Sequence, residues 1–154
     1  MIIPDINLLI YAYDSASPFH QKAVAWWQEC LSGAEPVGFP PVVILGFVRI
    51  ATNARAFHHP MTIAEAAGHV RGWLAQSCVQ ILESSPNQVE AVLKLLEDMG
   101  TAGNLVTDAQ IAFAALERDA TVHTTDTDFI RFPSLRWRNP LTGTGSHLVR
   151  KPQK

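Results

Sequence analysis

Apolar residues along this chain fall into two recurring patterns, short runs and longer segments with helical spacing. Met1 to Pro4 is a short run, and a second apolar segment, from Ile6 to Tyr13, follows it directly. From His20 to Leu31 apolar residues recur every three to four positions, as on one face of a helix. The patterns predict strands at 1–4, 37–39, 79–82, 121–124 and 135–137, helices at 6–13, 20–31, 42–53, 62–76, 85–100 and 103–119, and a helical turn at 126–130.

Capping and breaking residues support several of these boundaries. Pro4 cannot donate a ladder hydrogen bond, so it belongs near the end of its strand. Thr62 and Glu65 have the spacing of a capping box, while Gly33 and Gly100 are typical helix ends. Short β-branched strands alternating with helices of ten or more residues indicate an α/β domain with a parallel sheet. Sites in such sheets form at the carboxyl ends of strands, near the topological switch point.

The composition is typical of one globular domain. With 154 residues, 47% hydrophobic and 17% charged, the chain can bury a real core, and disorder is expected only at its ends. No stretch approaches the roughly 20 apolar residues of a membrane span. The apolar start lacks a basic leader and carries Asp5, so a cytoplasmic protein is expected. Cys30 and Cys78 have no CxxC spacing and are interpreted as buried free thiols.

The net charge of -2 does not indicate a nucleic-acid binder, but the basic residues are unevenly distributed. Half of the 12 lysines and arginines lie from Arg131 onward, where there is no aspartate or glutamate. Such a run is either a solvated tail or a contact for RNA phosphates or an acidic partner segment.

Four aspartates stand out by their positions. Asp5 ends the first predicted strand, and Asp126 and Asp128 directly follow the strand at 121–124. Asp108 lies within a helix, on the same face as a set of apolar residues. These residues are Ile111, Ala112 and Ala115. Because an ionised carboxylate on an inward face needs a partner and no lysine or arginine lies nearby along the chain, we expect a shared cation.

Mg²⁺ and Mn²⁺ take oxygen ligands and need only a few carboxylates. Clustered aspartates would otherwise repel one another and raise each other's pKa. A bound ion of this kind activates water and stabilises the charge that grows on a phosphate group during hydrolysis. The pattern therefore favours hydrolysis of phosphodiester bonds without a protein nucleophile.

Each aspartate also has a purely structural interpretation. Asp5 and Asp126 could be N-caps of the helices that follow them, and Asp128 could be a favourable first-turn acid. Asp108 could satisfy a helix N-terminus if its helix begins near Thr107. Together, the order D-x-N, helical TD and TTDxD is harder to explain in this way.

At this point the chain resembles a known family. The first motif of PIN domains, a strand ending in D-x-N, resembles the opening IPDINLLIYAYD. The second half of these domains resembles GNLVTDAQIAFAALERDATVHTTDTDFIRFPSLRW. The helix of VapC-type toxins, particularly of a subgroup common in mycobacteria, is similar to EPVGFPPVVILGFVRIATNARAF. The resemblance implies a PIN domain over residues 1–141 and an irregular basic tail over 142–154.

The resemblance also implies a three-layer αβα fold with a central, mostly parallel sheet of about five short strands. It implies a Mg²⁺- or Mn²⁺-dependent ribonuclease, a homodimer and inhibition by a small cognate antitoxin. Asp5, Asp108 and Asp126 match the family's metal ligands, and Asp128 is a further catalytic candidate. Asn7 and Thr125 match polar positions of the family that orient these carboxylates.

One position departs from the family pattern. Many PIN domains carry a glutamate in the helix where this chain has Gly46, and residues 37–64 contain no acid. Arg49, one turn further along the same helix, could contact RNA phosphate or the antitoxin, or it could form an ordinary salt bridge on the protein surface. The missing glutamate motivates an alternative, a non-catalytic PIN-like module that binds RNA or protein. A third reading, an aspartyl-phosphate enzyme with Asp5 as nucleophile, lacks a second acid at Asn7 and a suitably placed lysine.

Overall fold

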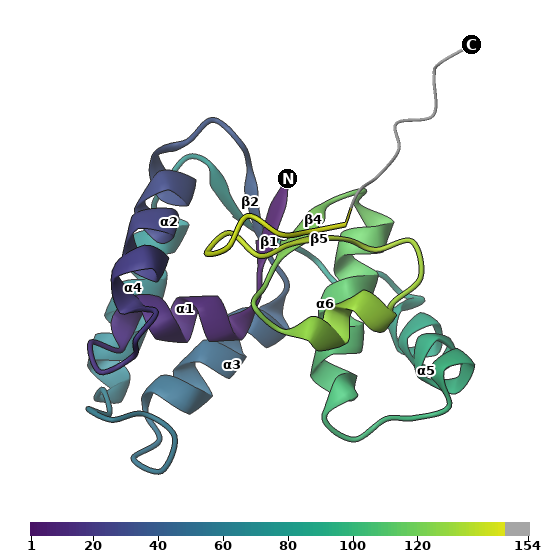
Figure 1. Ribbon diagram of the computed structural model, residues 1–154, viewed down its shortest axis with the longest axis horizontal. Helices are drawn as coiled ribbons and strands as arrows, with labels where there is room; N and C mark the ends of the chain where they lie inside the picture. Colours follow the sequence, from purple (N-terminus) through teal and green to yellow (C-terminus); the bar gives the residue numbers. More distant parts are fainter. Residues whose placement is uncertain (147–154) are drawn as a thin grey trace.

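The computed structural model describes residues 1–146, which form a five-stranded sheet with helices on its two faces (Figure 1). The strands are β1 (Ile2–Pro4), β2 (Val37–Phe39), β3 (Val79–Ile81), β4 (Thr121–His123) and β5 (Arg136–Arg138). The helices are α1 (Ile6–Tyr13), α2 (His20–Ser32), α3 (Pro41–Ala51), α4 (Ile63–Leu74), α5 (Gln88–Met99), α6 (Leu105–Glu117) and the 3₁₀ helix η1 (Thr127–Arg131). The predicted α/β class and every predicted element are confirmed.

The strand order is β3-β2-β1-β4-β5, and all four neighbouring pairs run parallel. The chain first moves outward from β1 to β3 and then returns to the other side of β1 for β4. Because parallel crossovers are right-handed, this reversal moves the connecting helices to the opposite face. Figure 1 shows α2 and α4 on one side of the strands and α5 and α6 on the other. The topological switch point therefore lies between β1 and β4.

Aromatic side chains fill the core on the α2 and α4 side. The Trp73 ring stacks on Phe39 at a centroid distance of 5.6 Å and meets Phe47 edge-on at 4.7 Å. It also meets Trp27 edge-on at 5.5 Å. Its Nε1–H group donates a hydrogen bond to the Tyr13 hydroxyl at 2.7 Å. One residue of α4 thus contacts β2 and three other helices, which fixes this layer of the domain.

Several element boundaries differ from the sequence-based ones by one to three residues. α5 begins at Gln88 because residues 85–87 form a turn in which the Ser85 carbonyl accepts the Gln88 N–H. The expected end of that helix at Gly100 is confirmed, with a left-handed φ of 67°. β5 begins one residue later than expected, at Arg136. Such shifts are typical of short elements, where a few hydrogen bonds decide where regular structure begins.

Residues 139–146, after β5, are irregular, as expected, but they fold back on the sheet. Gly145 forms an antiparallel bridge with Arg138, and the Ser146 N–H donates to the Trp137 carbonyl at 2.9 Å. The basic residues of the predicted tail, Arg150, Lys151 and Lys154, all lie outside the described residues. Within residues 1–146, no helix is both long and apolar enough to cross a membrane. Cys30 is buried and Cys78 is half-buried, and both are free thiols.

Thr62→Ala should lower the free energy of unfolding by about 1 kcal/mol, because it removes the helix cap of α4. The Thr62 hydroxyl accepts the Glu65 N–H at 3.2 Å, and the Glu65 carboxylate accepts the Thr62 N–H at 2.7 Å. Urea denaturation would measure the change, with Thr101→Ala, at an exposed position without a side-chain hydrogen bond in residues 1–146, as the matched control. Equal stabilities of the two variants would contradict the assigned role of the capping box.

Candidate functional site

The carboxyl ends of β1 and β4 lie side by side at the switch point, and an aspartate follows each strand. Asp5 comes directly after β1, and Asp126 comes three residues after β4. The parallel register pairs Pro4 with His123, and the Asp5 N–H donates to the His123 carbonyl at 2.8 Å. The sheet therefore brings these two acidic positions together at one edge.

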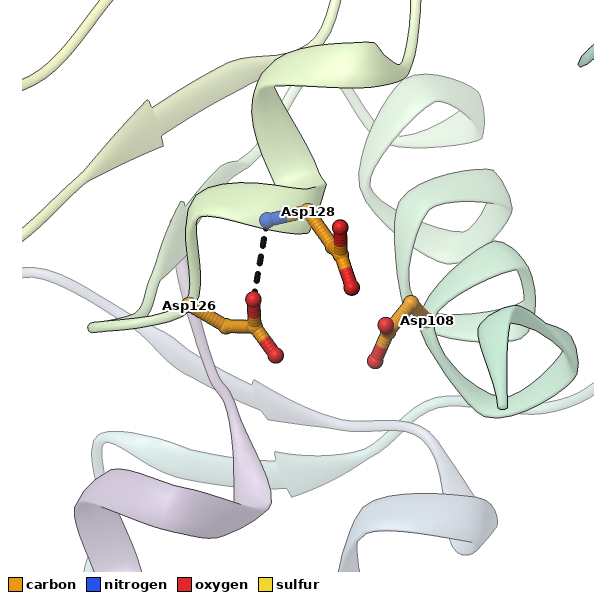
Figure 2. A group of neighbouring side chains, drawn as sticks. All are labelled: Asp108, Asp126 and Asp128. Carbon is orange, nitrogen blue, oxygen red and sulfur yellow. Dashed lines mark hydrogen bonds between the residues drawn. The ribbon is translucent and has the colours of Figure 1, made fainter.

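Three carboxylates converge beside this edge (Figure 2). Asp108 comes from the first turn of α6, and Asp126 and Asp128 come from the turn after β4. One carboxylate oxygen of each lies within 4.8 Å of the others. Figure 2 shows the three side chains directed toward a common space. Asp126 also caps η1, since its Oδ1 accepts the Asp128 N–H at 2.8 Å, and its second oxygen has no such role.

Asp5 lies outside this group of three, deeper in the protein. Its side chain is only 4% exposed, and its Oδ2 accepts a hydrogen bond from the Thr124 hydroxyl at 2.8 Å. Asp5 is also the N-cap residue of α1, without a side-chain cap hydrogen bond, and the backbone N–H groups of Ile6 and Asn7 act to lower the pKa of its carboxylate. The same Thr124 oxygen accepts the Asp126 N–H at 2.9 Å. Thr124 thus links Asp5 to Asp126.

The family resemblance pointed to Thr125, but in the structure its neighbour Thr124 contacts Asp5. Thr124 is 1% exposed, whereas Thr125 is half-buried and makes no side-chain hydrogen bond within residues 1–146. The pairing of β4 with β1 decides which of the two threonines faces Asp5, and no local sequence signal reveals that pairing. Asn7 lies in the first turn of α1, also without a side-chain hydrogen bond in the described part of the chain. The orienting roles of Asn7 and Thr125 stay predictions.

The surroundings of Asp108 and Asp5 disfavour the charged forms of these two carboxylates. Burial raises the pKa of Asp108 to about 7, and the negative charges of Asp5, Asp126 and Asp128 add to this effect. Burial likewise raises the pKa of Asp5 to about 6, although the hydrogen bond from Thr124 opposes the rise. Among residues 1–146 the only basic group in an ion pair with the cluster is Arg131, 3.8 Å from Asp128 and exposed.

This donor set fits a hard divalent cation. All the donors are carboxylate oxygens, they come from α6 and the turn after β4, and no buried basic residue in the described chain neutralises them. Mg²⁺ and Mn²⁺ bind such oxygen sets and usually retain water as further ligands. The same absence of a lysine gives no support to Asp5 as a phosphorylated nucleophile. Arg49, on the last turn of α3, is exposed and forms no ion pair within residues 1–146.

Comparison with known proteins agrees with this arrangement. The model of the PIN domain matches residues 2–135. This chain belongs to the PIN-domain family, in its VapC branch. Ribonuclease VapC33 of Mycobacterium tuberculosis is 45% identical over 141 residues, which cover 92% of this chain and 99% of VapC33. Ribonuclease VapC37 of the same organism is 36% identical over 140 residues, covering 91% and 97% of the two chains.

Solved structures share the fold at lower sequence identity. VapC20 of Mycobacterium tuberculosis, described as a sarcin-ricin loop cleaving toxin, aligns with a TM-score of 0.65 at 17% identity. The alignment covers 84% of this PIN domain and 93% of VapC20. VapBC-1 from nontypeable Haemophilus influenzae aligns with a TM-score of 0.62 at 19% identity, over 91% of this chain and 98% of that one. The predicted three-layer PIN fold is confirmed.

Gly46 lies in the buried part of α3 and packs closely against Ile6, the residue after Asp5. A Cβ atom at position 46 would lie only 2.4 Å from the Ile6 Cδ1 atom. The side chain of Ile6 therefore occupies the space that a residue at position 46 would need. A glutamate at position 46 of this PIN domain would require Ile6 to move. Since this chain has glycine at that position, the acidic residues of the candidate site are all aspartates.

The affinity for Mn²⁺ should fall by about tenfold or more between about pH 8 and about pH 6. Below its pKa of about 7, Asp108 carries a proton that the cation must displace, and Asp5 adds a second such proton near pH 6. Isothermal titration calorimetry in buffers of different ionisation enthalpy would measure both the affinity and the protons released. A flat affinity with no proton release would contradict the assignment of these two carboxylates to the site.

Gly46→Ala should lower the free energy of unfolding by up to about 2 kcal/mol, because overpacking against Ile6 outweighs the roughly 1 kcal/mol that alanine gains over glycine inside a helix. The double variant Gly46→Ala with Ile6→Val removes the Cδ1 atom responsible and should recover most of the loss. Chemical denaturation of both single variants and the double variant gives the coupling between the positions. Additive effects would show that the contact does not limit position 46.

Proposed function

We propose that this protein is a metal-dependent endoribonuclease, the toxin of a toxin–antitoxin pair, that hydrolyses RNA phosphodiester bonds. The observation that carries the proposal is the set of four aspartates at the switch point of a PIN domain, with no buried cation in the described chain to neutralise them. The relatives that match nearly the whole chain are named ribonucleases, and their identities of 45% and 36% support the same activity here.

Asp5, Asp108 and Asp126 are the proposed metal ligands, with Mg²⁺ or Mn²⁺ as the ion. The position of Asp128 beside Asp108 and Asp126 supports its inclusion in the site. When bound, the ion supplies an activated water and neutralises charge on the phosphate. Thr124 keeps Asp5 in place, and the cap of η1 holds Asp126 by one oxygen, so the other oxygen can face the ion.

The partners proposed for this chain are RNA and a small cognate antitoxin. Several solved structures with the same fold are complexes, including VapBC2 from Rickettsia felis bound to a DNA fragment from its promoter and FitAB bound to a DNA fragment. These complexes support an antitoxin partner. The homodimer, the contact of Arg49 with RNA or antitoxin, and the cytoplasmic location rest on the sequence alone and stay predictions.

The second candidate function is a non-catalytic module that binds RNA or protein. The observation that favours it is Gly46, which stands where many PIN domains carry a glutamate and packs against Ile6. Such a module would bind the metal ion and RNA without cutting the RNA.

Purified protein should cut total RNA at discrete sites in Mg²⁺ or Mn²⁺ and leave it intact with a chelator. Asp5→Asn combined with Asp108→Asn should reduce the cutting rate by about a hundredfold or more, because it removes two of the carboxylates that hold the ion. Asp98→Asn is the matched control, since this aspartate is exposed on α5 and pairs with Lys94 at 3.5 Å. Gel analysis of end-labelled RNA would measure the cuts.

Intact RNA together with measured metal binding would instead support the non-catalytic module. Cutting that persists in the double variant at the rate of the control would exclude the aspartate site as the source of the activity.

A further inference from the structure

A cavity of about 460 Å³ opens on the α2 side of the sheet, beside the uncovered parts of β4 and β5. The parallel register places Pro4, His123 and Arg138 side by side across β1, β4 and β5. Since Ile2 alternates with Pro4 in phase, the cavity residues Ile2, His123 and Arg138 share one face of the sheet. The helix α2 covers only one flank of this face, and Trp26 and Cys30 form that wall. The size is within the range of cavities that bind small molecules and cofactors.

The charged groups at the rim leave an excess of positive charge. Lys22 and Arg138 line the cavity together with two glutamates. The carboxylate of Glu35 is paired with the N-terminal ammonium group of Met1 at 3.1 Å. Lys22, Arg138 and Glu29 form no ion pair within the described chain. The rim therefore carries two positive side chains and one negative side chain that are not neutralised by an ion pair. An anionic group is favoured at this rim.

The wall of the cavity offers a neutral hydrogen-bond donor beside an aromatic ring. The Trp26 Nε1–H group donates to His123 Nδ1 at 3.0 Å. Since Nδ1 acts as an acceptor, the ring proton of the neutral histidine resides on Nε2. Nε2 has no hydrogen-bond partner within residues 1–146. The buried indole thus orients the histidine so that it can donate to a carbonyl or ring nitrogen of a ligand.

The cavity and the aspartates are connected through β4. His123 lines the cavity, its carbonyl accepts the Asp5 N–H, and the next residue, Thr124, donates to the Asp5 carboxylate. The cavity lies on the α2 side of the sheet and Asp108 comes from α6 on the other side, so β4 is the segment that the two sites share.

From these features we infer that the cavity binds a nucleoside monophosphate unit, with the base against Trp26 and His123 and the phosphate between Lys22 and Arg138. The indole of Trp26 suits a base, the histidine N–H is a donor for its edge, and the basic rim suits the phosphate. The unit is either part of an RNA chain or a free nucleotide. In the first case the inference rests on the proposed ribonuclease function and assigns a substrate subsite.

The test uses the full chain, labelled with ¹⁵N, and titrates it with adenosine and uridine monophosphate without metal. The indole signal of Trp26, identified by its loss in Trp26→Phe, should shift and saturate. Arg138→Ala should weaken the binding by about tenfold, because it removes a charge-assisted contact with phosphate. The matched control is Arg136→Ala, on the same strand but paired with Asp119 at 2.6 Å, and its effect should stay below about twofold.

A second measurement distinguishes the two sources of the nucleotide. If RNA is the ligand, Arg138→Ala raises KM for RNA cleavage by about tenfold and changes kcat by less than about twofold. Binding of the monophosphates without any change in KM identifies a free nucleotide as the ligand. A Trp26 signal that stays unchanged, together with an unchanged KM, overturns the inference. If the protein cuts no RNA at all, the proposed function fails, but the titration still tests the cavity.

Discussion

Mutual repulsion among four carboxylates is the constraint on which the functional end of this protein depends. Burial and the neighbouring charges raise the pKa of Asp108 to about 7, so its ionised form is unstable without a counter-ion. The fold holds the charges together by placing them at the end of β1, on α6 and in the turn after β4. The N-terminus of α6 also carries a partial positive charge, which favours an acid in its first turn. A divalent cation at this point would relieve the repulsion, which couples metal binding to the stability of the site.

The pairing of β1 with β4 turns four separate positions into one site. In this register the Thr124 hydroxyl reaches Asp5 and also accepts the Asp126 N–H. The same strand presents His123 to the cavity on the α2 side. Three-residue strands are marginal alone, but here the central strands β1, β2 and β4 are largely buried, and Trp73 fixes the layer of helices on the α2 side. The geometry of the site thus depends on packing far from the carboxylates.

The departure at Gly46 is also a matter of packing. Gly46 has no side chain, and the branched side chain of Ile6, the residue after Asp5, fills the space beside it between α1 and α3. PIN domains with a glutamate at this position have one more carboxylate, whereas this chain has an apolar contact between Gly46 and Ile6. The metal centre proposed here therefore relies on the aspartates of β1, α6 and the turn after β4.

The sequence by itself determined the element types, the α/β class and the strand-end positions of Asp5 and Asp126, because these follow from local periodicity, capping and turn residues. Local pattern could not distinguish Thr124 from Thr125, since only the β1–β4 register decides which hydroxyl meets Asp5. The cavity beside His123 was likewise beyond the sequence, because its walls come from α2, three parallel strands and the returning tail. Contacts between residues far apart in the chain carry no local signature, and the tertiary structure alone decided them.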